Sequence, residues 1–405
     1  ATLRFATNNR TCGIHSGPAT ITGGTITFNT SDNSFAAGKV LAFDTKAGTI
    51  NGSGQWRMRT DGAGVAVAAA ASGSTISVST LTLTGAITGG YVFDVADGAL
   101  ANDLTISAAI GSHSGGEAIV KAGAGTMAIT RQATFTGATT IQAGTLVLGV
   151  ANASGGTLAG TPSITVPTGA TLDLSAQDAI GWTGGKQAIV INGGTVTQSV
   201  TGVRSTVANT ITMTGGTLTA TGAGDASGNY SFFNGAGITA TSGAAGTAAM
   251  VNAPVIAIQT NGNFPVTVTR GAATPASDLT ISSVIRDNMS SSVGTLVKSG
   301  NGILTLAGAN TYRGQTTINQ GEVVLTGSLA STAATTVASG ATLRGTGGIA
   351  GPTTITGTLA PGVSGIGALT VNNTLTLNGS LVMDIHKSGA TRSADQLLGT
   401  GTLAC

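Results

Sequence analysis

Short apolar segments separated by glycine and asparagine run along the whole chain, and none of them recurs with the period of a helix. The stretch from Leu296 to Gly327 shows the pattern most clearly. Its apolar groups are Ile303–Leu306, Thr316–Ile318 and Val323–Leu325, and Gly-rich turns lie between them. Segments of about 4–6 residues bounded by turn residues are typical of β-strands. The pattern therefore predicts an all-β protein with almost no helix.

That stretch is the second copy of an earlier one. With an offset of 177 residues, twelve of the 29 positions from Val120 to Leu148 are identical to their partners. Just upstream, the pentapeptide Asp103–Ser107 returns as Asp278–Ser282. The chain thus contains an internal duplication over 103–149 and 278–327. Repeats on this scale predict a solenoid.

The later copy carries a recognisable motif in three parts, Lys298-Ser-Gly-Asn-Gly302, Asn310-Thr-Tyr-Arg-Gly314 and Thr316-Thr-Ile-Asn-Gln-Gly321. The motif closely resembles the strand repeat associated with autotransporter passengers. The copy that contains Lys121 is looser, because Ala133-Thr-Phe stands where the family has Asn-Thr-Tyr. The resemblance implies a right-handed parallel β-helix that is exposed outside a bacterial cell or on its surface. It implies little about activity.

Strand-and-turn units continue along the chain without a Pro/Ser-rich linker or a run of charge. Because each repeat of a solenoid packs only on its neighbours, we expect one continuous β-solenoid over residues 1–405. Residues 220–250 fit the pattern least well and are expected to form a loop. The segment Asp395–Gly401 resembles the near-terminal turn of family passengers.

The composition excludes several classes of partner. Charged residues make up 8% of the chain, and the net charge is +2 without a basic cluster. Nucleic-acid binding requires a Lys/Arg stripe with stacking aromatic residues, so no nucleic-acid partner is expected. No apolar run reaches about 18 residues, so we expect no transmembrane segment in this chain. Aromatic residues are only 3%, and a narrow core of Val, Ile, Leu, Thr and Ala is expected.

The scattered acidic residues argue against a carbohydrate-active enzyme, because hydrolysis of sugars requires two carboxylates about 5–9 Å apart. Asp94 and Asp97 are close enough in sequence to share a site, although two solvated carboxylates at a strand end are the commoner outcome. Asp103 and Asp278 occupy equivalent places in the duplication, so we expect them to bind turn amides. His113 lies in a Gly/Ser loop and is expected at the surface. We therefore predict no enzymatic activity, no cofactor and no metal.

Two tryptophans are candidate glycan contacts, since an exposed indole ring can stack on a sugar. Trp56 and Trp182 both stand among glycines. The alternative for each is a ring that covers the end of the core, and this alternative is the more frequent one.

The two cysteines, Cys12 and Cys405, stand near opposite ends of the chain. In a long β-helix they are too far apart for an intramolecular disulfide, which needs Cα atoms within about 7 Å. Open solenoid ends expose strand edges that favour the addition of another chain, and such a heterologous contact propagates as a filament. A possible intersubunit disulfide between Cys405 and Cys12 would then lock the filament. Two unrelated thiols are the other interpretation.

Three functions are left open by the sequence. The favoured one is a structural extracellular protein that associates head to tail into a surface fibre, sheath or matrix. The second is an adhesin or autotransporter passenger stalk that binds host or surface glycans. The third, least favoured, is a carbohydrate-active β-helix enzyme.

Overall fold

The structure, a computed structural model, describes residues 2–5, 19–29, 33–34, 40–59, 64–182, 187–233, 235–259, 262–273, 275–289, 291–388 and 391–404. These residues form 47 β-strands and no helix, so the all-β prediction is confirmed. The described part of the chain accordingly offers no helix that could cross a lipid bilayer. The chain divides into two compact units, and each is described by itself. Unit 1 comprises Ala1–Val190 and Gly194–Val200, and unit 2 comprises Ile191–Gly193 and Thr201–Cys405.

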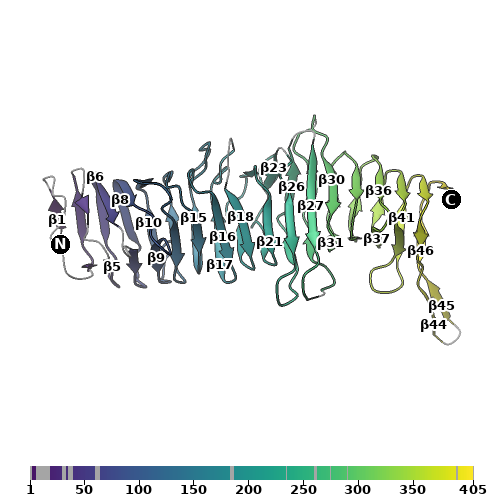
Figure 1. Cartoon of the computed structure of the whole chain (residues 1–405), viewed down its shortest axis with the longest axis horizontal. Coiled ribbons are helices and arrows are strands. Elements are labelled where there is room, and N and C mark those ends of the chain that lie inside the picture. The colour runs from purple at the N-terminus through teal and green to yellow at the C-terminus, as the bar shows by residue number, and fades with distance from the viewer. Residues whose placement is uncertain are drawn as a thin grey trace. The chain divides into compact units, whose positions relative to one another are not determined.

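Unit 2 has three faces, each built from parallel strands (Figure 1). Face A contains β22 (Thr217–Leu218), β25 (Ala249–Val251), β28 (Leu279–Ile281), β31 (Ile303–Leu306), β34 (Glu322–Leu325), β37 (Thr342–Gly345), β40 (Thr358–Pro361) and β43 (Ser380–Leu381). Face B contains β21 (Ile211–Thr214), β24 (Ile238–Thr241), β27 (Asn263–Thr269), β30 (Thr295–Ser299), β33 (Thr316–Ile318), β36 (Thr335–Val337), β39 (Thr353–Ile355), β42 (Leu375–Leu377) and β47 (Leu403–Ala404). Face C contains β20 (Ser205–Val207), β23 (Tyr230–Phe232), β26 (Val255–Ile258), β29 (Val284–Asp287), β32 (Ala309–Asn310), β35 (Ser328–Leu329), β38 (Gly348–Ile349), β41 (Ala368–Val371) and β46 (Gln396–Leu398).

The chain visits faces B, A and C in turn, so strands three places apart pair in parallel. Examples are β24 with β27 on face B and β31 with β34 on face A. One circuit of the three faces is called a coil here. A chain that returns to the same face in the same direction on every coil is a parallel β-helix, and the predicted fold class is confirmed.

Unit 1 is built in the same way from two long ladders. Its face A contains β1 (Thr2–Phe5), β3 (Thr25–Phe28), β4 (Asn33–Ser34), β6 (Thr49–Arg59), β8 (Ser74–Thr84), β10 (Leu104–Ile106), β11 (Ala109–Ser112), β13 (Thr126–Ile129), β15 (Gly144–Leu148), β17 (Ala170–Leu174) and β19 (Thr195–Thr197). Its face B contains β2 (Ala19–Ile21), β5 (Val40–Phe43), β7 (Gly64–Val67), β9 (Tyr91–Val95), β12 (Ile119–Ala122), β14 (Thr139–Ile141) and β16 (Ser163–Pro167). The strand β18 (Ala188–Asn192) crosses the boundary between the units. The prediction of one continuous solenoid over 1–405 stays a prediction.

The core of each unit is filled by ladders of aliphatic side chains that point inward on consecutive coils. In unit 2, Leu304, Val323, Leu343 and Leu359 are paired one above the next, and none of them is more than 1% exposed. Burial of each such side chain stabilises the fold by roughly 1.5–3 kcal/mol. Because every coil needs only a few of these residues, a chain with 3% aromatic residues can still form a continuous core.

The expectation of a loop over residues 220–250 is wrong. Three strands, β23, β24 and β25, lie in or at the end of this stretch. Tyr230 and Phe232 are buried in β23, and the rings of Phe232 and Phe264 have centroids 4.8 Å apart. Small residues at the surface of these coils hide the alternation of buried and exposed positions in the sequence.

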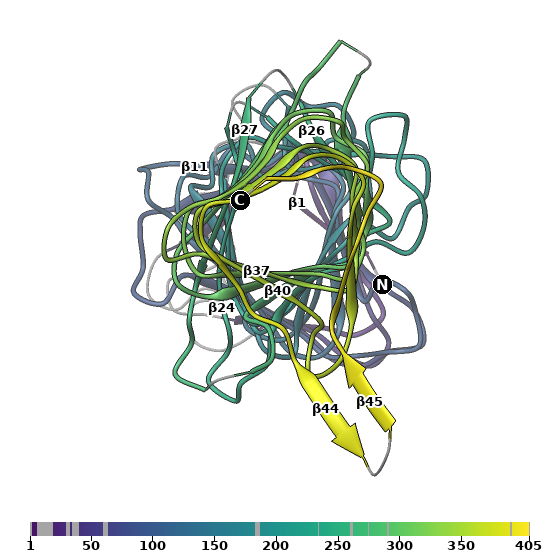
Figure 2. The same cartoon turned by 90° about the vertical axis from the view of Figure 1, so that its right-hand side faces the viewer.

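One antiparallel hairpin interrupts the coils of unit 2. Its strands β44 (Ile385–Ser388) and β45 (Thr391–Ala394) pair in antiparallel fashion and project away from the coil (Figure 2). The Asp395 carboxylate closes the base of the hairpin by accepting hydrogen bonds from the backbone N of Gly367 at 2.8 Å and of Asp384 at 2.7 Å. After the hairpin the chain returns to face C, where β46 pairs with β41.

A substitution of Gly321 tests the turn geometry on which the coils depend. It has φ +70°, and a Cβ there would lie 2.5 Å from the carbonyl oxygen of Gly300 in the previous coil. We expect Gly321→Ala to lower the free energy of unfolding by about 2 kcal/mol or more, because left-handed backbone costs an L-residue roughly 1–2 kcal/mol before the clash is added. The measurement is urea unfolding followed by circular dichroism. The control is Gly348→Ala, since Gly348 lies in β38 and the added methyl group would enter open space, and equal losses in both variants would contradict the prediction.

Candidate functional site

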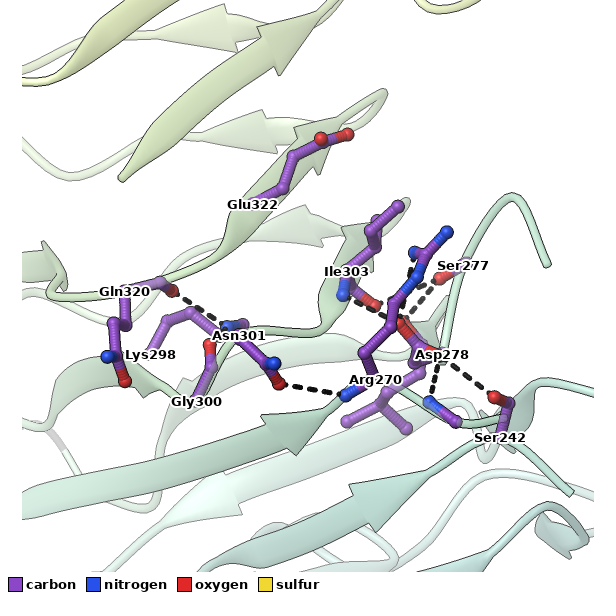
Figure 3. Close-up of polar contacts among 12 residues, drawn as sticks. Ser242, Arg270, Ser277, Asp278, Lys298, Gly300, Asn301, Ile303, Gln320 and Glu322 are labelled. Atoms are coloured by element: carbon purple, nitrogen blue, oxygen red, sulfur yellow. Dashed lines mark hydrogen bonds and ion pairs between the residues drawn. The ribbon is translucent and has the colours of Figure 1, made fainter. Parts of the chain in front are cut away.

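Each copy of the duplicated segment completely buries one lysine. Lys298 lies in β30 and is 0% exposed. Its Nζ donates hydrogen bonds to the carbonyl oxygens of Ser299 at 3.0 Å, Gly300 at 2.7 Å and Gln320 at 2.9 Å. Figure 3 shows this lysine beside the turn that contains Gly300. All three hydrogens of the ammonium group therefore have an acceptor.

Lys121 in β12 has the same surroundings. Its Nζ donates to the carbonyl oxygens of Ala122 at 2.8 Å, Gly123 at 2.8 Å and Ala143 at 3.1 Å. In both copies two acceptors follow the lysine directly and the third lies 22 residues further on, which is the turn of the next coil. Each lysine thus joins two consecutive coils, and the two lysines make matching contacts.

Burial lowers the pKa of both lysines from the ordinary value of 10.5 to about 8. Nearby carboxylates oppose the shift, Asp94 and Asp103 for Lys121 and Asp278 and Glu322 for Lys298. At neutral pH each group is still an ammonium ion with three donors, and it has no access to solvent. Such a lysine cannot act as a nucleophile or a base on an external substrate. Its chemistry is that of a structural clamp.

Asp278 is a second buried clamp, which Figure 3 shows beside Ser242 and Ile303. Its Oδ2 accepts hydrogen bonds from the backbone N of Ile303 at 2.9 Å and lies 3.3 Å from Nη1 of Arg270. Its Oδ1 accepts from Oγ of Ser242 at 2.8 Å and from the backbone N of Gly271 at 3.2 Å. Burial alone would raise the pKa of this carboxyl, but the hydrogen bonds and the Arg270 charge outweigh it and hold the pKa below the usual range.

Asp103 performs the same task in the first copy. Its Oδ2 accepts from the backbone N of Thr126 at 2.8 Å, and its Oδ1 accepts from the backbone N of Gly98 at 2.8 Å. Thr126 and Ile303 stand at equivalent positions of the duplication. The prediction that Asp103 and Asp278 bind turn amides is therefore confirmed.

Glu117 is a buried acid that the sequence analysis missed. It is 0% exposed, and its Oε1 accepts hydrogen bonds from the backbone N of Ser114 at 2.8 Å and of Gly115 at 3.1 Å, while its Oε2 accepts one from the hydroxyl of Ser112. Burial opposes ionisation, yet these hydrogen bonds lower the pKa of Glu117 to about 2. The sequence did contain a signal for this buried acid. Glu117 is a single glutamate directly after a Gly/Ser loop, in a chain with few charged residues.

The two candidate glycan contacts differ in exposure. Trp56 lies in β6 and is 2% exposed, so its ring belongs to the core and offers no face on which a sugar can stack. Trp182 is 47% exposed, and its Nε1 donates to the carbonyl oxygen of Asn152 at 3.4 Å. Of the two, only Trp182 is placed to meet a ligand.

The other candidate residues do not lie together in one site. Asp94 is exposed in β9, Asp97 is exposed in the loop that follows, and His113 is exposed in the loop held by Glu117. Among the described residues, no three His, Cys, Asp or Glu side chains gather in a way that could hold a metal ion. Cys12 and Cys405 lie outside the described residues.

The two segments that contain the buried lysines match a known repeat. A family model described as the passenger-associated-transport-repeat matches residues 119–148 and 296–325. These two segments of the chain are therefore similar to the passenger-associated transport repeat. In each match the lysine is the third residue, and the second strand of the match lies on face A. Neither a comparison with curated proteins nor one with solved structures gave a match.

Removal of one clamp should be costly. We expect Lys298→Met to lower the free energy of unfolding by about 2–4 kcal/mol, because a methionine leaves three turn carbonyls without their donor. Urea unfolding of the full chain measures the change. The control is Lys387→Met in the exposed strand β44, which should be neutral within about 0.5 kcal/mol. A loss of similar size in both variants would show that the carbonyl contacts contribute nothing.

The lowered lysine pKa also predicts a dependence of stability on pH. Between about 8 and 10.5 the unfolded lysine holds a proton that the folded one has released, so the free energy of unfolding should rise with pH through this window. Below about pH 8 both states are protonated and the lysines add no slope. Urea midpoints of the wild type and of Lys298→Met, taken at several pH values, test this. The rise should be shallower in the variant, and identical slopes would refute the assignment.

Proposed function

We propose that the chain is a structural passenger, a β-helical scaffold exposed outside a bacterial cell. This proposal rests on what the buried charged side chains bind. Lys121, Lys298, Asp103 and Asp278 all bind backbone atoms of the coils, and two of them lie inside or beside each passenger repeat. The polar chemistry of these coils thus serves the scaffold.

We further propose that the scaffold associates end to end into a surface fibre, sheath or matrix. Support comes from the parallel ladders of unit 2, because an open end of such a ladder presents a strand edge with which a further parallel strand can pair. Unpaired strand edges with apolar neighbours favour the addition of another strand. Such an edge is extended either by further chain or by a second copy. The disulfide between Cys405 of one copy and Cys12 of the next belongs to this proposal.

The alternative is an adhesin stalk that binds host or surface glycans, and the exposure of Trp182 favours it. A fibre and a stalk would have the same β-helical scaffold. They differ in what the scaffold binds, which is another copy of the chain in a fibre and a glycan in a stalk. No catalytic activity is proposed for either, since Asp103 and Asp278 hold backbone groups and Asp94 and Asp97 are exposed at the end of β9 and in the loop after it.

The test is negative-stain imaging of the purified chain, together with gels run with and without reducing agent. The expected result is filaments, with a ladder of covalent oligomers that disappears on reduction and in Cys12→Ser. Filaments that persist in Cys12→Ser would show that strand stacking alone is sufficient. Single particles without oligomers would refute end-to-end association. Single particles that bind glycan-coated beads, with binding lost in Trp182→Ala, would establish the adhesin alternative.

A further inference from the structure

Face B of unit 2 presents an uncharged surface over many coils. The strands concerned are β21, β24, β27, β30, β33, β36, β39 and β42. They contain one charged residue, Lys298, and it points inward and is 0% exposed. The outward positions of these strands are occupied mainly by threonine, with asparagine, serine, valine and proline at a few places.

Three of these strands repeat a Thr-x-Thr pattern in register. Thr212 pairs with Thr239, which pairs with Thr267, and the second threonine of each strand follows the same order as Thr214, Thr241 and Thr269. The residues between and before them, such as Met213 and Val268, are buried at 1% or less. The six threonines form a two-by-three net that we call the threonine array. Further along the same face, Thr317, Thr336, Thr354 and Thr376 form a separate single row, which is in register with Val297 and Pro265 and not with the array.

The hydroxyl groups of the array are available for an external contact. Within the described part of the chain, none of the six makes a hydrogen bond to the protein, and all six side chains are exposed or half-buried. Other surface threonines of the same protein do find partners. Thr27 in unit 1 donates to Oδ1 of Asn51 at 2.7 Å, and Thr295 donates to Oδ1 of Asn263 at 2.6 Å.

The backbone fixes the spacing of the array. Parallel strands lie about 4.8 Å apart, and residues i and i+2 of one strand are separated by about 6.6 Å. Threonine is β-branched and has few χ1 rotamers, so the net of hydroxyl and methyl groups is rigid before it meets a ligand. Rigid groups lose little conformational freedom on binding, which lets many weak contacts add up on a regular surface.

We propose that the threonine array binds the surface of ice crystals. A prism face of hexagonal ice presents water oxygens on a rectangular net with comparable repeats, so water held by the hydroxyls can continue the lattice while the methyl groups order the water between them. A charged side chain would hold its own hydration shell and disrupt that lattice, and the array has none. The six threonines themselves offer no aromatic ring with which to grip a flexible peptide or a single sugar chain.

This activity is independent of end-to-end association, because the array lies on the side of the coils and not on a strand edge. It goes beyond the structural role, and the proposed location outside the cell is where ice would form. A scaffold with such a face would hold its cell against ice or limit the growth of crystals around it.

The experiment measures how much of the full chain is incorporated into slowly growing ice, relative to a protein known to be excluded, and whether it inhibits recrystallisation. The wild type should enter the ice and inhibit recrystallisation. Thr239→Tyr places a bulky ring at the middle strand of the array and should abolish both effects. The matched control is Thr280→Tyr, which changes an outward threonine of β28 on face A, between the buried Leu279 and Ile281, and should retain both.

Circular dichroism and melting temperature establish that the variants are folded. If Thr239→Tyr fails to fold, the double variant Thr239→Val/Thr267→Val, which keeps the shape and removes two hydroxyls, takes its place and should lower incorporation at least severalfold. Exclusion of the wild type from ice would overturn the proposal, as would equal loss in Thr280→Tyr. Binding to crystalline cellulose or chitin that Thr239→Tyr abolishes, without any binding to ice, would assign the face to a polysaccharide and also overturn it.

Discussion

The fold depends on satisfying the backbone groups at the corners of each coil. Strand pairing uses the N–H and C=O groups of the faces, but the turns between faces leave carbonyls and amides that no strand can reach, and buried groups of this kind are costly when unpaired. Lys298 supplies three donors to such carbonyls, and Asp278 supplies acceptors to such amides. A cation and an anion, placed inside the corners, thereby tie one coil to the next.

This use of charge explains the character of the surface. In the duplicated coils, five charged side chains are turned inward, namely Asp103, Glu117, Lys121, Asp278 and Lys298. Arg131 and Arg313 stay exposed, and many of the other outward strand positions are threonine, serine or alanine. β-Branched residues suit flat stacked strands, so the same choice that stabilises the coils also makes their faces uniform. The scaffold and its surface both follow from the inward placement of charge.

The sequence predicted the fold class and the turn-binding role of Asp103 and Asp278, because a residue that recurs at the same place in a repeat has a local structural reason to be there. It marked Lys121 and Lys298 as repeated residues but did not predict what they bind. It did not reveal Glu117, whose partners are amides of its own loop and of residue 85. It also could not separate Trp56 from Trp182, since both have glycine neighbours and only the direction of the side chain decides burial. The error at 220–250 has the same origin, because small residues give no alternation to follow.

The hairpin β44–β45 shows how the coil tolerates an insertion. The chain leaves after β43, makes an excursion of two antiparallel strands, and returns to face C with β46 in register on β41, while Asp395 holds the two ends of the excursion together. The neighbouring coils do not have to adjust. A foreign peptide or a small domain grafted between Ser388 and Thr391 would therefore be displayed from a closed stem, and a β-helix of this kind can gain new surface functions at its corners without a change to its core.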